Sequence, residues 1–377
     1  MEISGYCDSA FEPVREAFLS NFENHSEVGA AIALHVDGHP VLSLWGGWSD
    51  IEAETPWTED TLTNVWSTTK GVAATIVAML VSKGLLKYED RVSKHWPEFA
   101  ACGKGDVTVA MLLSHQSGLS GFREPVTVST FYDSRAAAAT LAAMEPLWKP
   151  GHGYGYHPVT IGFLVDELCL RVTGKNIRTL ALELLPPECR EDIYIGCPDD
   201  QRHRAAKMYA PSDLSSADAG GQDLTDIQIL ALANPVMDPE APNTTEWRSA
   251  MIPSANGFAS ARGLSVLYGS LVKAENDGTN GLVTPAVLQK CCTPQVSGVD
   301  KTLGLEARWG CGYLVNSLGL FGPTIASFGH TGWGGSFAFA DPEKRLGFAY
   351  VMNKMGTELI NDPRNTALVE AIYHCVR

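Results

Sequence analysis

Hydrophobic and polar positions predict strands near both ends of the chain. In residues 28–50, two apolar runs rich in β-formers flank Asp37 and Gly38, a pattern typical of a hairpin with a tight turn. Three further runs of the same character, separated by turn residues, lie near the other end, at 308–317, 326–342 and 346–354. We therefore expect one antiparallel sheet built from both ends of the chain and flanked by helices.

The middle of the chain is predicted to be mainly helical. Helices are expected at 67–83, 134–148, 160–176 and 261–276, with a final helix at 364–377. Residues 107–119 are expected to form a short helix that ends in a loop. Gly84 and Gly174 are typical residues for the ends of two of these helices. Residues 186–250 are rich in Pro, Asp, Ser and Gly, and they predict long loops with short helices.

The helix predicted at 67–83 is apolar on nearly all sides, which is typical of a buried helix. Ser67 and Lys70 stand three residues apart at its start, so their side chains share one face. Burial disfavours the charged form of Lys70, and the helix N-terminus places N–H groups and a positive dipole end near Ser67. The pair is therefore predicted to form an activated serine nucleophile.

A purely structural role for the pair is the alternative. Serine is a favoured helix cap, and lysine side chains often extend from helix ends toward water. The same spacing recurs at Ser270 and Lys273, late in an amphipathic helix, where the serine gains nothing from an N-terminal dipole. We interpret that second copy as chance, because only the Ser67 copy opens a buried helix.

Four segments occur in a recognisable order: WSTTKG at 66–71, LLSHQSGL at 112–119, a Pro-Gly-to-Tyr segment at 149–164, and a segment with His-Thr-Gly at 328–353. Together they resemble class C β-lactamases, DD-peptidases and the related family VIII carboxylesterases, over roughly residues 25–375. The resemblance implies an α+β fold of the β-lactamase/transpeptidase type, with an antiparallel sheet from both chain ends and a helical insertion. We expect a single serine-hydrolase module over 1–377, with an α/β part at about 1–66 and 250–377 and a mainly helical part at about 67–249.

The third segment places Tyr156 at the position of the family's catalytic tyrosine. The resemblance implies that its phenol bonds to Ser67 and Lys70. Near a cation the pKa of Tyr156 would fall, so either Tyr156 or Lys70 could act as the general base. The alternative is a packing role in an aromatic, glycine-rich loop with Tyr154 and His157.

Two departures from the β-lactamase pattern favour esters as substrates. The family's Tyr-x-Asn ends here in Pro158, whose side chain offers no hydrogen bond to an amide. The family's Lys-Thr-Gly is here His330-Thr331-Gly332, and histidine is mostly neutral at pH 7, whereas lysine suits the carboxylate of a β-lactam or a terminal D-Ala. Both changes resemble the esterase branch, although His330 could instead hold the sheet edge.

Acyl transfer also requires N–H donors aimed at the oxyanion. The resemblance implies the backbone N–H groups of Ser67 and Trp333. Gly332 and Gly334 would let the backbone and the substrate approach closely. The Trp333 side chain would either line the acyl pocket or belong to the core. His115 is expected to stabilise a loop.

Composition and charge exclude several other classes. The 377 residues carry a net charge of −15 at pH 7, which disfavours nucleic acids and anionic membranes as partners. No apolar run reaches the length of about eighteen residues that a membrane span needs. The first residues lack a signal-peptide core, so a cytoplasmic location is expected. The cysteines form no Cys-x-x-Cys pair and no cluster has metal-ligand spacing, so no metal or cofactor is predicted.

The sequence thus predicts a serine carboxylesterase that hydrolyses small, short-acyl-chain esters through an acyl-enzyme on Ser67, with Lys70 and Tyr156 as general base and acid. Weak β-lactam hydrolysis is an expected side activity. The alternatives are an acyltransferase or transesterase, an amide or peptide hydrolase of the same fold, or a non-catalytic binding module. The absence of Gly-x-Ser-x-Gly argues against an α/β-hydrolase. Asn256 and Gly257 are expected to form a turn near the site.

Overall fold

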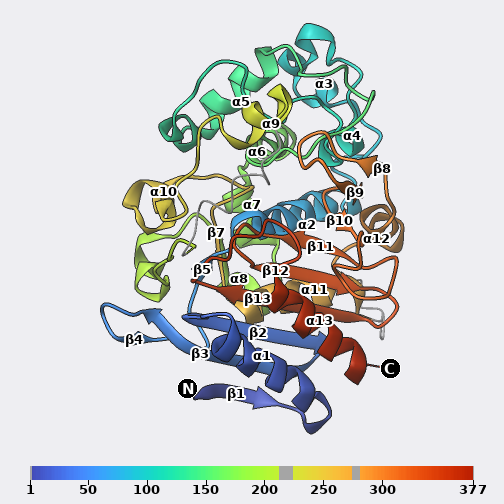
Figure 1. The fold of residues 1–377 in the computed structure, drawn as a ribbon. Coiled ribbons are helices and arrows are strands. Elements are labelled where there is room, and N and C mark those ends of the chain that lie inside the picture. Colours follow the sequence, from blue (N-terminus) through green and yellow to red (C-terminus); the bar gives the residue numbers. More distant parts are fainter. Residues whose placement is uncertain (1, 212–223, 274–280, 377) are drawn as a thin grey trace.

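An antiparallel sheet and a group of helices stacked at one end of it make up the molecule (Figure 1). This computed structural model describes residues 2–211, 224–273 and 281–376. Within them, the strands in sheet order are β1 (Ile3–Cys7), β3 (His39–Asp50), β2 (Gly29–Val36), β13 (Leu346–Met352), β12 (Phe337–Asp341), β11 (Phe328–Thr331), β10 (Leu314–Val315), β9 (Glu306–Trp309) and β8 (Val296–Val299), with β4 (Thr55–Pro56) beside β3.

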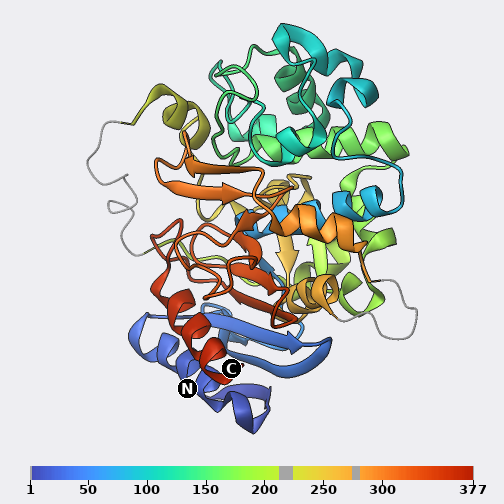
Figure 2. The ribbon, with the colours of Figure 1, turned by 90° about the vertical axis from the view of Figure 1, so that its right-hand side faces the viewer.

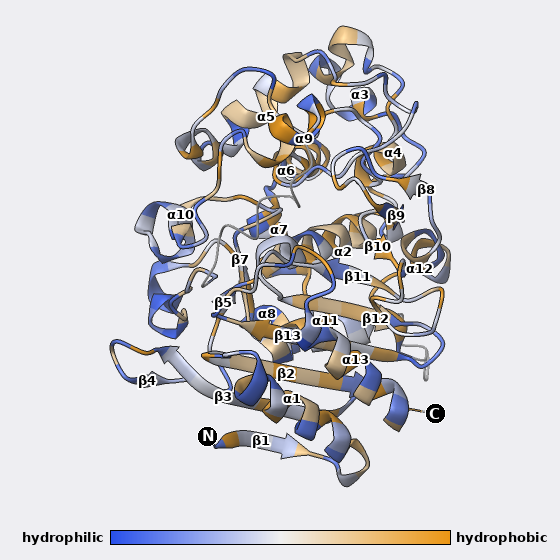
Figure 3. Cartoon of the chain, viewed as in Figure 1, coloured by the Kyte–Doolittle hydropathy of each residue, from blue (hydrophilic) through white to orange (hydrophobic). Residues whose placement is uncertain are grey.

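The two ends of the chain meet in the middle of this sheet. Strand β2 pairs antiparallel with β13, from Ala30 opposite Met352 to Val36 opposite Leu346. Every residue of β13 is buried, and the central strands are among the most hydrophobic segments in Figure 3. The prediction of one antiparallel sheet from both chain ends is therefore confirmed.

Helices cover both faces of the sheet. Helix α11 (Ala261–Val272) packs on β2 and β13, while α1 (Glu12–Asn24) and α13 (Pro363–Cys375) lie side by side on the opposite face (Figure 2). The approach of α11 is close, because a Cβ on Gly347 would lie 2.1 Å from the backbone nitrogen of Gly269. Glycine at this crossing lets the helix rest directly on the strand.

The remaining helices surround α2 (Thr69–Ser82) or lie beyond it (Figure 1). They are α3 (Val92–His95), α4 (Val109–Leu113), α5 (Ser134–Ala143), α6 (Thr160–Thr173), α7 (Ile177–Leu184), α8 (Pro187–Arg190), α9 (Asp226–Leu232), α10 (Thr245–Ser249) and α12 (Pro285–Cys292). Every residue of α2 from Thr69 to Leu80 is buried, as predicted for a helix apolar on all sides. Among the described helices, none is long and apolar enough to cross a membrane.

Several predicted boundaries need correction. The helix expected at 134–148 ends at Ala143, because Met144 is already extended. The helix expected at 261–276 ends at Val272, and 274–276 lie outside the described residues. Gly174 ends α6 in the left-handed conformation, as predicted.

Several elements were not predicted. They include α7, α12, β1, α1 and β8, and a second sheet of β5 (Thr63–Asn64), β7 (Gly257–Ala259) and β6 (Ile193–Ile195). The division of the chain into an α/β part and a helical part stays a prediction.

Candidate active site

The candidate nucleophile stands on a short, strained turn. Ser67 lies in the 3-10 turn Trp66–Thr68 that leads directly into α2, and its side chain is half-buried. Trp66 has a φ of 44°, which is unfavourable for a bulky residue. Its ring packs between Trp247 at 5.2 Å and Trp333 at 4.9 Å. This aromatic packing holds the backbone that presents Ser67.

The Lys70 amine lies between three oxygen atoms. Its Nζ is 2.9 Å from Ser67 Oγ, 2.5 Å from the Pro158 carbonyl and 2.8 Å from the Ser254 carbonyl. Burial lowers the pKa of Lys70 well below its ordinary value of 10.5, which favours the neutral amine. A neutral amine has two N–H donors, and both carbonyls can only accept. In the neutral form, two donors on the carbonyls leave the lone pair for the Ser67 hydroxyl, the arrangement that a general base requires.

Tyr156 completes this group, although one prediction about it is wrong. The Lys70 amine lies 4.8 Å from the centre of its ring, and Ser67 is a neighbouring side chain that acts to lower the pKa of its phenol. The sequence suggested that a nearby cation would lower the pKa of Tyr156. Instead, burial of the phenol raises this pKa well above 10. The phenol therefore keeps its proton at neutral pH.

His330 lies beside this group on β11. The side chain is 2% exposed, and its ring centre is 5.9 Å from that of Tyr156. Nδ1 lies 2.7 Å from the Thr331 carbonyl, to which it donates, while Nε2 has no hydrogen-bond partner in the described part of the chain. Burial lowers the pKa of His330 to about 3. The position that holds lysine in the resembled family is therefore uncharged here.

The loop after β11 is tied to the nucleophile turn. Ser336 Oγ donates to the Val65 carbonyl at 2.8 Å, and Thr68 Oγ1 donates to the Ser336 carbonyl at 3.2 Å. At Gly332 a Cβ would lie 2.4 Å from the Val65 carbonyl oxygen, so only glycine fits between the two segments. Gly334 has a φ of +86° and lies against Met355, so it also requires glycine.

This loop also carries the second candidate oxyanion donor, the N–H of Trp333, directly after Gly332, which packs against Val65 and Thr68. Neither the Ser67 N–H nor the Trp333 N–H donates to another residue within the described ranges. Their role as oxyanion donors stays a prediction. The Trp333 side chain is half-buried and packs edge-on against Trp66, at the border of the core.

Two backbone groups of this site were missed by sequence reasoning. The carbonyls of Pro158 and Ser254 orient the lysine, and a backbone carbonyl leaves no signal in residue type. The turn expected at Asn256 and Gly257 is instead the entry to β7, where the Gly257 N–H donates to Thr69 Oγ1 at 2.8 Å. This contact anchors the segment that carries the Ser254 carbonyl to the start of α2.

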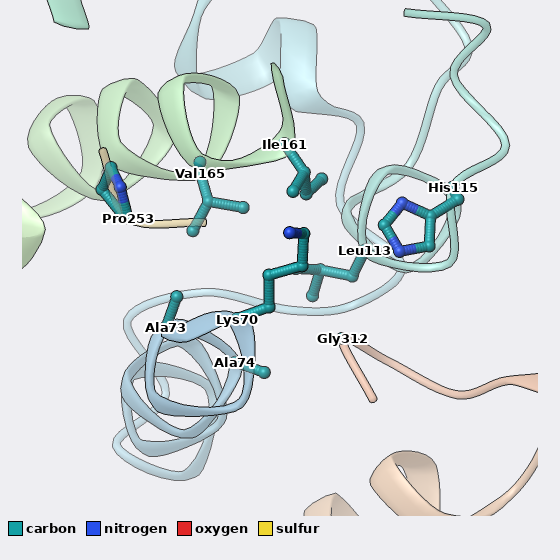
Figure 4. A pocket seen from close by; sticks show the side chains of 10 residues that line it. Lys70, Ala73, Ala74, Leu113, His115, Ile161, Val165, Pro253 and Gly312 are labelled. Atoms are coloured by element: carbon teal, nitrogen blue, oxygen red, sulfur yellow. The ribbon is translucent and has the colours of Figure 1, made fainter. Parts of the chain in front are cut away.

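The His115 ring packs edge-on against that of Tyr156, with 5.2 Å between ring centres. His115 also faces a small cavity beside Lys70 (Figure 4). The cavity measures about 20 Å³, room for about one water molecule. Its wall is otherwise mostly apolar. His115 Nδ1 accepts from the His157 N–H at 3.2 Å, and burial lowers the pKa of His115 well below 6.5. The ring thus supports the Tyr156 loop in its neutral form.

Known proteins similar to this chain share its fold over the whole length. The Beta-lactamase family pattern matches residues 14–371. The esterase/beta-lactamase LipL of Mycobacterium tuberculosis is 32% identical over 392 aligned residues, covering 100% of this chain and 88% of LipL. A crystal structure of a family VIII carboxylesterase is 40% identical, with a TM-score of 0.93 and 100% of both chains covered. A penicillin-binding protein homologue from Caulobacter crescentus is 41% identical, with a TM-score of 0.91 and the same coverage.

The chain therefore belongs to the beta-lactamase family. It is a serine hydrolase with the esterase/β-lactamase fold, close to the family VIII carboxylesterases. The predicted fold class and the resemblance on which it rested are confirmed. The roles of the individual site residues stay predictions.

Proposed function

We propose that the protein is a carboxylesterase that hydrolyses small, neutral esters with short acyl chains through an acyl-enzyme on Ser67. The observation that carries this proposal is the surroundings of Lys70. Its two carbonyl partners direct the amine lone pair at Ser67, while the neutral, buried His330 stands where a cation would attract an anionic substrate. No cofactor takes part.

Acylation begins when Ser67 Oγ attacks the ester carbonyl and Lys70 takes its proton. The N–H groups of Ser67 and Trp333 stabilise the negative charge that develops on the carbonyl oxygen. When the tetrahedral intermediate collapses, the bond to the leaving alcohol breaks and Tyr156 gives that oxygen a proton. Lys70 then returns its proton to Tyr156, which leaves the acyl group on Ser67.

Deacylation uses the same groups in reverse. A water molecule attacks the acyl carbon, and its proton passes by way of Tyr156 to Lys70. The second tetrahedral intermediate is held by the same N–H groups. Its collapse breaks the bond to Ser67 Oγ, which takes the proton back from Lys70, and the carboxylic acid leaves.

The polar groups around the serine support esters over anionic amides. His330 supplies no positive charge for a carboxylate, and the Pro158 side chain supplies no hydrogen bond for an amide. Binding of a β-lactam or a terminal D-Ala thus loses interactions that the resembled enzymes provide. We therefore propose β-lactam hydrolysis only as a weak side activity. Transfer of the acyl group to an alcohol or amine is the alternative fate of the acyl-enzyme.

The proposal is tested by hydrolysis of p-nitrophenyl butyrate by the wild type and by Ser67→Ala, with a chromogenic cephalosporin in parallel. We expect ester turnover in the wild type and its loss by a factor of about 10³ or more in the variant. Ser270→Ala removes the serine of the second Ser-x-x-Lys copy and serves as the matched control, with unchanged turnover. Ester turnover retained in Ser67→Ala would refute the nucleophile. Faster turnover of the cephalosporin than of the ester would refute the substrate class.

A further inference from the structure

Tyr156 is held in place by a carboxylate that sequence reasoning did not single out. Asp300 lies in the loop between β8 and β9 and is completely buried. Each of its two carboxylate oxygens lies 2.9 Å from the Tyr156 backbone nitrogen. The carboxylate thus accepts a hydrogen bond from the main chain of the candidate acid–base residue itself.

The same carboxylate also fixes the ring beneath Tyr156. Trp309 Nε1 donates to Asp300 Oδ2 at 3.0 Å. The Trp309 ring stacks on the Tyr156 ring, with 5.2 Å between ring centres and 4° between planes. One buried group therefore holds both the backbone of Tyr156 and the surface on which its phenol ring lies.

The charge of Asp300 is balanced by N–H groups alone. Its remaining partners are the backbone N–H groups of Thr302 and Leu303, each at 2.9 Å, and it forms no ion pair within the described residues. Burying a carboxylate without a cation is costly, so the site uses every acceptor position of Asp300 to offset that cost. Its negative charge also disfavours loss of the proton from the neighbouring phenol of Tyr156.

We propose that Asp300 is a positioning residue for catalysis: through the Tyr156 N–H and the Trp309 ring it aims the protonated phenol at Ser67 and at the leaving alcohol. This inference rests on the proposed function, in which Tyr156 protonates the departing oxygen. Asp300 itself does not touch the substrate.

A leaving-group comparison tests this role. p-Nitrophenyl butyrate and ethyl butyrate form the same acyl-enzyme, but only the ethoxide needs a proton as it departs. A misplaced phenol therefore slows the ethyl ester more. In Asp300→Asn, we expect the ratio of kcat/KM for the nitrophenyl ester to kcat/KM for the ethyl ester to rise about tenfold. Tyr156→Phe should raise the same ratio at least as much, and the double variant should show no further rise.

Two further variants separate positioning from folding. Asp166→Asn is the matched control. Asp166, on α6, is also buried and accepts a hydrogen bond from the Ile177 N–H at 2.8 Å. It should lower the melting temperature and leave the ratio unchanged. Trp309→Phe keeps an aromatic ring on Tyr156 but removes the bond to Asp300, and it should raise the ratio by a smaller factor. If Asp300→Asn does not fold, the Trp309→Phe variant tests the positioning role in its place.

The outcomes distinguish the inference from the proposed function. If Tyr156→Phe raises the ratio while Asp300→Asn and Trp309→Phe leave it at the wild-type value, Asp300 is only structural and the inference fails alone. Equal losses on both esters in Asp300→Asn, together with a lower melting temperature, would likewise show a purely structural role. If Tyr156→Phe itself leaves the ratio unchanged, the acid role of Tyr156 fails, and the inference fails with it.

Discussion

At the scale of single residues, the site depends on an amine whose pKa is lowered by burial and which has no carboxylate partner in the described part of the chain. Lys70 is buried by the apolar start of α2, and its donors are taken by the carbonyls of Pro158 and Ser254. Desolvation lowers the pKa of the amine, while it raises the pKa of the Tyr156 phenol. The two groups are therefore driven toward opposite roles, base and acid.

The pH dependence of activity follows from the Lys70 pKa. Because the neutral amine is the active form, kcat/KM for p-nitrophenyl butyrate should rise as the pH increases through that pKa. Since burial places the pKa well below 10.5, the rise should reach a plateau well before that pH. Lys70→Arg, which stays charged, should lose at least about 10² in kcat/KM across the range. A wild-type kcat/KM that keeps rising up to pH 10.5, with chemistry shown to be rate-limiting, would contradict this assignment.

Residue types predicted part of this site but not the rest. Ser67, Lys70 and Tyr156 were predictable neighbours, because their spacing and sequence surroundings resemble one family. Asp300 was not, since a single acidic residue in a loop has no pattern. The direction of the Tyr156 pKa shift was predicted wrongly because the sequence shows which charges are near but not how deeply a phenol is buried.

At the scale of elements, the site depends on how closely the nucleophile turn approaches the loop after β11. Ser336 and Thr68 join these two segments by hydrogen bonds. The Gly332 Cα fills the space between them, with no room for a side chain. The distance between the two candidate oxyanion donors is thus set by backbone packing.

Substitution of Gly332 tests this dependence. In Gly332→Ala the new Cβ would lie 2.2 Å from Ser336 Oγ and 2.4 Å from the Val65 carbonyl oxygen, so the loop must move. We expect kcat for p-nitrophenyl butyrate to fall about 10- to 100-fold with a smaller change in KM, because the donors act mainly in the transition state.

Gly105→Ala is the control, since its Cβ would make only an ordinary contact of 3.7 Å with Ala100. Its steady-state kinetics should match those of the wild type. A Gly332→Ala variant with wild-type kcat would show that the loop position does not matter for catalysis.

Long elements with an extended apolar pattern were predictable, and short or polar ones were not. Helices α2 and α6 were found because apolar residues and a terminal glycine mark them. Strand β1 was missed because three of its five residues are exposed, so no alternation of buried positions appears. Strands β5, β6 and β7 have two or three residues each, too few for a periodic pattern.

At the scale of the whole molecule, a buried polar cluster joins the two ends of the chain behind the site. Arg364, near the start of α13, forms ion pairs with Asp362 at 2.6 Å and with Glu27 at 3.3 Å. It also donates to the Gly334 carbonyl at 2.6 Å. Glu27, just before β2, accepts a hydrogen bond from Tyr350 on β13. Assembly of the sheet from both chain ends thus also holds Gly334, in the loop after β11, in place.

This cluster predicts a pH dependence of stability. Burial raises the pKa of Glu27 from 4.5 to about 7, and two carboxylates share one guanidinium. A group with a higher pKa in the folded state than in the unfolded state stabilises the fold at a pH below both pKa values. This stabilisation is lost as the pH rises through the pKa of the folded state. Between about pH 4.5 and 7.5, Glu27 should therefore remove about 3 kcal/mol from the free energy of unfolding.

Urea unfolding at pH 5 and pH 8 measures this effect. Glu27→Gln mimics the protonated side chain, so its unfolding free energy should change less between the two pH values than that of the wild type, by about 3 kcal/mol. Glu183→Gln removes an exposed carboxylate paired with Lys175 and should behave like the wild type. Parallel pH dependences in Glu27→Gln and the wild type would show that Glu27 does not titrate in this range.

The central claim, that an ester acylates Ser67, is tested most directly by trapping the intermediate. The protein would be mixed with p-nitrophenyl butyrate, quenched in acid during turnover, and analysed by mass spectrometry of the intact chain and its peptides. The account predicts the mass increase of one butyryl group, located on the peptide that contains Ser67 and missing in Ser67→Ala. A butyryl group on another residue, or turnover with no acylated protein when deacylation is rate-limiting, would contradict it.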